Sequence, residues 1–193
     1  MKISFLASHG GSSARHIIAA MREGQLDAEP GILITNNRDA PIRQWCLDNA
    51  IEVLHISSKT HGNEDKVDRA IASALYQAGS NLVVCSGYMK KIGPDTLRHF
   101  PYKILNIHPA LLPDFGGKGM YGDLVHQAVL AAGKTESGAT VHYVTDGIDE
   151  GPIIKQHVVP VYKDDTLDTL RSRVQACEPE LYLSALTELL QDE

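Results

Sequence analysis

Residues 2–13 read KISFLASHGGSS, and this stretch points to the fold. Lys2–Ala7 is a short, mostly apolar run, which is typical of a buried strand. Ser8–Ser13 is a glycine-rich turn, and Ser12 or Ser13 is suited to cap a helix that runs to about Glu23. A buried strand, a tight turn and a helix in direct succession predict the first unit of an α/β sheet.

The alternation of strands and helices continues to Pro113. Apolar runs predict further strands at Gly31–Thr35, Glu52–Ile56, Leu82–Ser86 and Ile104–His108. Helical patterns between them predict helices at Pro41–Asn49, Asn63–Gly79 and Pro94–Phe100. Because the connections are short, we expect a doubly wound sheet of parallel strands.

The pattern changes after Pro113. The elements expected there are a glycine-rich loop at Phe115–Gly122, a helix at Asp123–Ala132, strands at Ala139–Thr145 and Ile153–Val161, and a helix at Thr166–Leu190. The two strands are expected to pair antiparallel, and Pro179 is expected to bend or interrupt the last helix. The sequence therefore predicts a Rossmann-like, doubly wound, mostly parallel α/β sheet with a C-terminal antiparallel strand pair and a closing helix.

Composition limits the classes of function. The chain has 193 residues, which suits a single domain, and 43% of them are hydrophobic, which argues against gross disorder. The net charge is -6 and both signs are mixed along the chain, so nucleic acid is not an expected partner. An anionic ligand would have to be held by local groups rather than by a general positive field.

Cysteine and histidine spacing argues against disulfides and metal sites. The three cysteines, Cys46, Cys85 and Cys177, are far apart, and the nine histidines show no metal-ligand spacing. The apolar run at the N-terminus is too short for a signal sequence, and no run reaches membrane-spanning length. We therefore expect a cytoplasmic protein without a metal ion and without a membrane partner.

The turn at Ser8–Ser13 is a candidate phosphate site. Glycines let the backbone approach an anion closely, and a helix N-terminus offers free N–H groups. The turn matches neither the dinucleotide-binding pattern nor a P-loop. The alternative interpretation is a turn that any such fold needs after its first strand.

Asn106 and His108 form the second candidate. Alternate residues of a strand point to the same side, so both side chains are expected together at the carboxyl end of a strand, where open α/β sheets bind ligands. An amide and an imidazole can stabilise an oxyanion and supply a proton. The alternative interpretation is a core histidine beside a structural proline, Pro109.

Asp149 is the third candidate, in the turn-rich segment Asp146–Pro152. A carboxylate that reached His108 would favour the protonated imidazole and orient its ring. An aspartate in such a segment is otherwise explained by turn formation. His142, on a strand-like run, is interpreted as structural. Lys90–Lys91 follow the fourth strand and could meet an anionic ligand.

These segments together resemble the phosphoribosylglycinamide formyltransferases, folate-dependent enzymes of purine synthesis. The resemblance spans essentially the whole chain. The most specific segments are Ser86–Met89, Asn106–Pro113, Gly116–Gly122, Ser137–His142 and Asp149–Pro152. It implies formyl transfer from 10-formyltetrahydrofolate, a co-substrate, to the amine of glycinamide ribonucleotide. It also implies small-molecule substrates only.

The resemblance assigns roles to individual residues. The catalytic trio would be Asn106, His108 and Asp149. The phosphoribosyl acceptor would contact Gly10, Gly11, Ser12, Ser13 and Glu178. Folate would contact Tyr88, Met89, Lys90, Lys91, Ile92, Asn106, Val144, Thr145 and Asp146. Residues 1–193 would form one formyltransferase domain, with a phosphate-binding half at 1–113 and a folate and catalytic half at 114–193.

The sequence departs from the family at three places. Ser13 stands where the family's phosphate loop usually has asparagine. Lys90–Lys91 follow Met89 where the family usually has an arginine. Glu64 aligns with an arginine that is common in the family. The first departure bears on the acceptor, and the other two bear on the folate contacts.

Three other functions are left open. One is formyl transfer to another amine, such as an amino sugar nucleotide, and a second is hydrolysis of formyltetrahydrofolate. The third is a non-catalytic regulator that binds a phosphorylated metabolite. The chain is expected to be a monomer or a homodimer.

Overall fold

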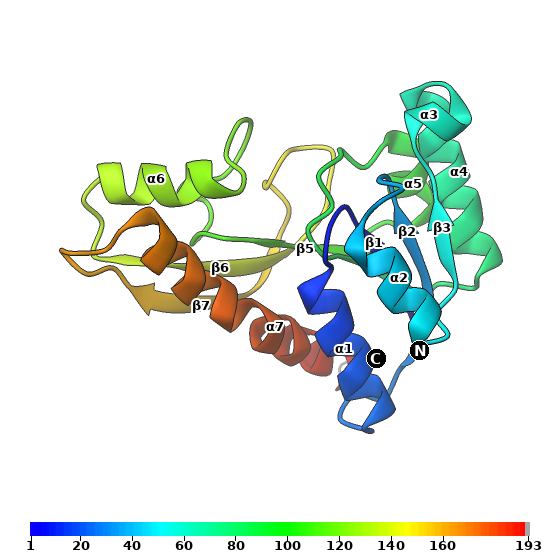
Figure 1. The fold of residues 1–193 in the computed structure, drawn as a ribbon, viewed down its shortest axis with the longest axis horizontal. Helices are drawn as coiled ribbons and strands as arrows, with labels where there is room; N and C mark the ends of the chain where they lie inside the picture. The colour runs from blue at the N-terminus through cyan, green and yellow to red at the C-terminus, as the bar shows by residue number, and fades with distance from the viewer. Residues whose placement is uncertain (192–193) are drawn as a thin grey trace. The chain divides into compact units, whose positions relative to one another are not determined.

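A computed structural model describes residues 1–191 of the chain, which divide into two compact units. The first unit is Met1–Leu105, and the second begins at Asn106 (Figure 1). The family resemblance divides the chain by ligand, into a phosphate-binding half at 1–113 and a folate and catalytic half at 114–193. That division stays a prediction.

The first unit is built on four parallel strands. β1 (Lys2–Ala7) pairs on one side with β2 (Glu29–Thr35) and on the other with β4 (Leu82–Cys85), and β3 (Val53–His55) pairs with β2. Ile3, Phe5 and Leu6 of β1 are completely buried. Burial on both faces of the sheet explains why these strands read as apolar runs rather than as alternating patterns.

Helices lie on both sides of these strands, as the alternating pattern predicts. They are α1 (Ser12–Arg22), α2 (Pro41–Asp48), α3 (Ser58–His61), α4 (Glu64–Gln77) and α5 (Pro94–His99). In Figure 1, α1 and α2 lie in front of the strands and α4 and α5 behind them. The short helix α3 was not predicted. It begins with a capping box between Ser57 and Thr60, a signature that depends on side-chain geometry.

β5 (Ile104–His108) is shared by the two units, and the second unit continues with α6 (Asp123–Ala131), β6 (Glu136–Tyr143), β7 (Ile153–Pro160) and α7 (Leu167–Gln191). The sheet order is β3-β2-β1-β4 in the first unit, and it continues through β5 to β6 and β7. β6 and β7 pair antiparallel. The predicted Rossmann-like sheet, with its antiparallel C-terminal pair and closing helix, is therefore confirmed.

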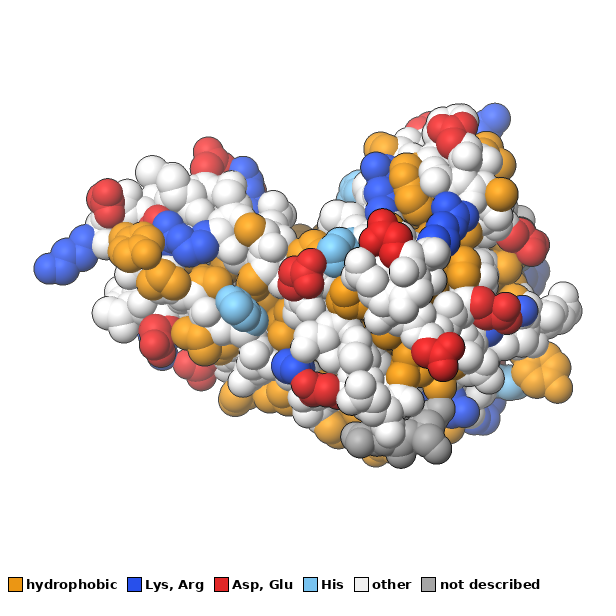
Figure 2. Space-filling view, turned by 90° about the horizontal axis from the view of Figure 1, so that it is seen from below, with side chains coloured by type: hydrophobic (Ala, Val, Ile, Leu, Met, Phe, Trp, Pro, Cys, Tyr) orange, Lys and Arg blue, Asp and Glu red, His pale blue; other side chains and the backbone are white. Residues whose placement is uncertain are grey.

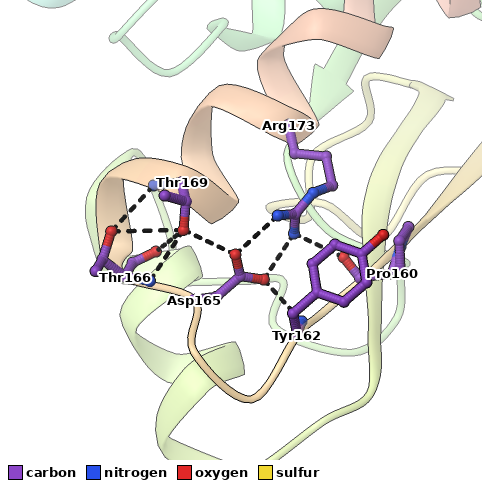
Figure 3. Close-up of polar contacts among 6 residues, drawn as sticks. All are labelled: Pro160, Tyr162, Asp165, Thr166, Thr169 and Arg173. Carbon is purple, nitrogen blue, oxygen red and sulfur yellow. Dashed lines mark hydrogen bonds and ion pairs between the residues drawn. The ribbon is translucent and has the colours of Figure 1, made fainter.

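α7 packs against β6 and β7 and also contacts α6. α7 is not interrupted at Pro179. It is one continuous helix of 25 residues with the proline inside it. A polar network fixes its first turn, as Figure 3 shows. Both carboxylate oxygens of Asp165 accept from Arg173, at 2.6 and 2.8 Å, and the guanidinium lies 4.5 Å from the centre of the Tyr162 ring. Because Arg173 also donates to the Pro160 carbonyl, the network joins the end of β7 to the helix.

The surface carries mixed charge. Figure 2 shows one face on which acidic and basic side chains are interspersed, without a continuous basic patch. Within residues 1–191, none of the helices combines the length and the apolar character that crossing a membrane requires.

Candidate active site

Asn106 and His108 lie on β5 and begin the second unit. They are alternate residues of the strand, so their side chains leave it on the same side. His108 is only 3% exposed, whereas Asn106 is half-buried. The strand therefore presents an amide and a buried imidazole together, as the spacing predicts.

Both ring nitrogens of His108 face oxygen acceptors. Nε2 donates a hydrogen bond to the carbonyl of Phe115 at 2.8 Å, and Nδ1 lies 3.3 Å from Oδ2 of Asp149. A carbonyl can only accept, so Nε2 carries a proton. His108 therefore joins the Phe115 carbonyl on one side to the Asp149 carboxylate on the other.

Asp149 is held in place by its own backbone and by the glycine-rich loop. Its φ of 58° lies in the left-handed region, where aspartate is one of the few tolerated residues. The backbone N–H of Gly117 donates to Oδ2 at 3.0 Å. At Gly116, a Cβ would lie 2.5 Å from Leu112 Cδ2 and 3.3 Å from Asp149 Cβ, so only glycine permits this approach. The loop thus contacts both His108 and Asp149.

His142 belongs to the same cluster, although its sequence context suggested a structural role. Its Nδ1 donates to the Tyr143 carbonyl at 3.0 Å, so Nε2 is left to accept from the Asn106 amide at 3.2 Å. Burial lowers its pKa below the usual value, partly offset by the Tyr143 carbonyl and Asp149, so the ring is neutral at pH 7. Nε2 also lies 3.7 Å from Oδ1 of Asp149. His142 therefore orients the Asn106 amide.

Two local features lie beside His142 and the segment that follows His108: the pairing of β6 with β7, and the hydrogen bonds of Thr140. The β6–β7 register shifts between Val141 and His142, where Ile154 of β7 is the unpaired extra residue. The buried hydroxyl of Thr140 accepts from the Leu112 N–H at 3.0 Å and donates to the Ala110 carbonyl at 2.7 Å. Thr140 and His142 are polar residues on one face of an apolar strand, and this pattern was the available sequence signal.

The cluster combines an amide donor, an imidazole and a carboxylate. The side chains of His108, His142 and Asp149 are at most 10% exposed, so water screens them weakly. Such a set can stabilise a developing oxyanion and move a proton. Within residues 1–191, no group of three His, Cys, Asp or Glu side chains is placed to hold a metal ion. Independence from metal stays a prediction.

Comparison with known proteins identifies the family. The formyl transferase family matches residues 1–186. A phosphoribosylglycinamide formyltransferase of Bacillus subtilis is 35% identical over 98% of this chain and 94% of its own length. The chain belongs to the formyl transferase family.

Two further relatives agree with this assignment. The chloroplastic phosphoribosylglycinamide formyltransferase of Arabidopsis thaliana is 37% identical over 96% of this chain, which spans 64% of that protein's length. The crystal structure of glycinamide ribonucleotide transformylase 1 from Symbiobacterium toebii superposes with a TM-score of 0.90 at 35% identity, covering 97% of this chain and 86% of that one.

The remaining residues that family resemblance assigns in the second unit lie on α7 and in the β6–β7 connection. Glu178 is a half-buried residue of α7, and burial raises the pKa of its carboxyl to about 7. Val144 and Thr145 are half-buried, while Asp146 is exposed. These three residues directly follow β6, in the connection that also carries Asp149.

In the first unit, the turn after β1 has the geometry of an anion-binding helix start. Gly11 occupies the N-cap position of α1 with a φ of 58°, and it has no side chain to bond the first N–H groups of the helix. A Cβ at this position would lie 2.9 Å from Ile42 Cδ1. The N–H of Ala14 is taken by the Ser86 hydroxyl at 3.1 Å. Within the described residues 1–191, no hydrogen bond occupies the N–H of Ser12 or Ser13, so both are available to a ligand.

The segment after β4 borders a cavity of about 910 Å³ within the first unit. Tyr88, Met89 and Lys90 line it together with residues that follow β1, β2 and β3, including Asn36. Lys91 is exposed and Ile92 is buried, and neither lines the cavity. Burial, with nearby Cys85, Glu64 and Asp68, raises the pKa of Tyr88 well above its usual range, so its hydroxyl stays protonated.

Proposed function

We propose that the chain transfers a formyl group from 10-formyltetrahydrofolate to the amine of glycinamide ribonucleotide, a step of purine synthesis. The observation that carries the proposal is the ion pair between His108 and Asp149 beside the Asn106 amide, in a chain of the formyl transferase family. The names of the relatives support the choice of acceptor. Cytoplasmic location and a monomeric or dimeric state stay predictions.

The proposed reaction passes through a tetrahedral oxyanion. The neutral amine attacks the formyl carbon, and the carbonyl electrons move onto the oxygen. The second N–H of Asn106 stabilises this oxyanion, because its first is engaged by His142. Protonated His108 contributes its positive charge. Collapse of the intermediate then breaks the bond between carbon and the folate nitrogen.

Proton transfer completes the exchange. Nε2 of His108 gives its proton to the departing folate nitrogen, directly or through water, which requires the Phe115 carbonyl to release it. Asp149 accepts the amine proton through an ordered water, and its Oδ2 already lies 3.3 Å from Nδ1 of His108. The two transfers leave the net charge of the cluster unchanged, and a water then carries the proton from Asp149 to Nε2 of His108, which restores both groups.

The acceptor phosphate is proposed to bind Gly10, Gly11, Ser12 and Ser13. The glycine cap and the two free N–H groups support this placement. Ser13 replaces the family's asparagine, but its backbone N–H is unchanged by that substitution. Glu178 is proposed to contact the amine end of the acceptor, and its ionised form would do so best.

Folate is proposed to contact Tyr88–Ile92, Val144–Asp146 and Asn106. The cavity beside Tyr88, Met89 and Lys90 has a volume within the usual range for ligand sites, which is roughly 300–1,000 Å³. Glu64 also lines this cavity. Lys90 supplies a positive charge for the carboxylates of the folate tail, in place of the family's arginine.

An absorbance assay tests the proposed function. The protein is mixed with 10-formyltetrahydrofolate and one amine at a time, and loss of the formyl group is followed. Transfer that requires glycinamide ribonucleotide supports the proposal. Transfer to an amino sugar nucleotide would replace the acceptor, and release without any amine would replace transfer by hydrolysis. Saturable binding without release would indicate a regulator.

A further inference from the structure

Two buried serines tie the start of α1 to the segment after β4, all within the first unit. Ser86 is 4% exposed, and its hydroxyl accepts the Ala14 N–H at 3.1 Å. Ser8 is 2% exposed, and its hydroxyl accepts the Met89 N–H at 2.8 Å. The Ser8 backbone N–H also donates to the Gly87 carbonyl at 3.2 Å.

The Ser8 hydroxyl is fixed from a third direction. It donates to Oδ1 of Asn36, which follows β2, at 2.6 Å. The Ser8 hydroxyl therefore donates its proton to Asn36 and accepts from Met89. Because Ser8 follows β1 and Asn36 follows β2, the ends of these two strands fix the position of Met89. Losing the Ser8 hydroxyl would leave the Met89 N–H without its protein partner.

The ties join segments that are proposed to hold different ligands. Ala14 directly follows the Gly10–Ser13 turn, which is proposed to hold the acceptor phosphate. Met89 lies inside Tyr88–Ile92, which is proposed to contact folate. The Ala14 N–H is buried, and a buried N–H left without its hydrogen bond is unfavourable, so the start of α1 and the segment after β4 resist moving independently.

We infer that Ser8 and Ser86 are positioning residues that couple the binding of the two substrates. A ligand that orders one segment also orders the other through these hydrogen bonds, so the second ligand loses less conformational entropy when it binds. The coupling is reciprocal, as any linkage between two binding sites must be. This inference rests on the proposed function, because that proposal assigns the two ligands.

Calorimetry on the whole chain measures the coupling directly. Tetrahydrofolate is titrated with and without saturating glycinamide ribonucleotide, a pair that cannot react because no formyl group is present. In the wild-type protein, we expect the Kd of tetrahydrofolate to fall by about fivefold or more when the acceptor is bound. In Ser86→Ala and in Ser8→Ala, we expect this ratio to fall clearly below the wild-type value, because each variant removes one of the hydrogen bonds that join the two segments.

Ser4→Ala is the matched control. Ser4 is also completely buried in the first unit, and its hydroxyl accepts the Ile32 N–H at 3.2 Å. Its other hydrogen-bond partner is Ser80, and neither Ile32 nor Ser80 belongs to the two tied segments. We expect Ser4→Ala to lower thermal stability as Ser86→Ala does, while the coupling ratio stays at the wild-type value.

The outcomes separate this inference from the proposed function. A wild-type protein that binds both ligands independently, or a Ser86→Ala variant with wild-type coupling, would overturn the inference alone. Loss of coupling in Ser4→Ala would also overturn it, because general loosening would then explain the effect. A wild-type protein that binds neither ligand would overturn the proposed function and the inference together.

Discussion

The turn at Gly10–Ser13 and the cluster of Asn106, His108 and Asp149 offer ligands different kinds of atoms. The turn offers backbone N–H groups at the start of α1, whereas the cluster offers side chains from β5 and from the β6–β7 connection. A backbone donor survives most substitutions, and a side-chain donor does not. Changes in the cluster should therefore abolish chemistry, while changes in the turn should mainly weaken binding.

His108→Ala should give the largest effect. It removes the proton donor and leaves the Asp149 carboxylate without its 3.3 Å partner. We expect kcat to fall at least ~100-fold, the scale for loss of a general acid or oxyanion donor. Single-turnover formyl transfer measures it, with far-UV circular dichroism to verify folding. Turnover near the wild-type value would remove the basis of the proposed mechanism.

Asp149→Asn tests the charge of the cluster rather than its shape. Asparagine tolerates the left-handed φ of 58° and can still accept from the Gly117 N–H, so the backbone should be preserved. We expect kcat to fall at least ~100-fold, because the imidazolium loses its counter-ion. Steady-state kinetics with saturating substrates would show it. A change confined to KM would contradict a catalytic role.

Gly11→Ala tests the turn. The new Cβ would lie 2.9 Å from Ile42 and would force alanine into the left-handed region, so the turn should shift. We expect the acceptor KM to rise about tenfold, which corresponds to roughly 1.4 kcal/mol, with little change in kcat. Gly24→Ala is the control, because Gly24 has a φ of 72° and open space around it. An equal rise in KM in both variants would argue against a specific role of the turn.

His142→Phe sharpens the assignment of the cluster. Phenylalanine fills similar space but cannot accept from the Asn106 amide, which is then free to rotate. We expect kcat to fall about 3- to 10-fold, the scale of one net hydrogen bond, with both KM values nearly unchanged. Kinetic constants for both substrates provide the test. A change in folate KM alone would instead place His142 in ligand binding.

Glu178→Gln should give the smallest effect at neutral pH. Because the pKa of Glu178 is raised to about 7, half of the carboxyl is ionised at that pH, and the ionised fraction grows as pH rises. If the carboxylate contacts the acceptor, its KM should fall by about twofold from pH 7 to pH 8. The glutamine variant should lose this pH dependence, measured with steady-state kinetics. Identical pH profiles would show that Glu178 does not contact the acceptor in its charged form.

The raised pKa of the Glu178 carboxyl also predicts the direction in which the stability of the fold changes with pH. Its folded pKa lies above its usual value of 4.5, so the folded state retains a proton that the unfolded chain releases. The free energy of unfolding should therefore decrease as pH rises from about 4.5 to 7. His142 acts in the opposite direction, because its lowered pKa makes acid unfavourable for the folded state.

The sequence by itself determined the order of the elements and the pairing of Asn106 with His108. Apolar runs and turn residues are local signals, so the bounds of β1, α1 and β5 were predicted within a few residues. The two-residue period of a strand placed both side chains on one side. Resemblance to the family, rather than spacing, linked Asp149 to them.

Only the tertiary structure decided what surrounds His108. The Phe115 carbonyl and the Gly117 N–H are backbone groups, which leave no trace in residue identity. The contact between His142 and Asn106 joins β6 to β5, and contacts between strands that are distant in sequence are set by packing. Pro179 likewise lies inside a continuous helix despite its local tendency to break one, because burial of α7 residues such as Val174 and Leu181 outweighs that tendency.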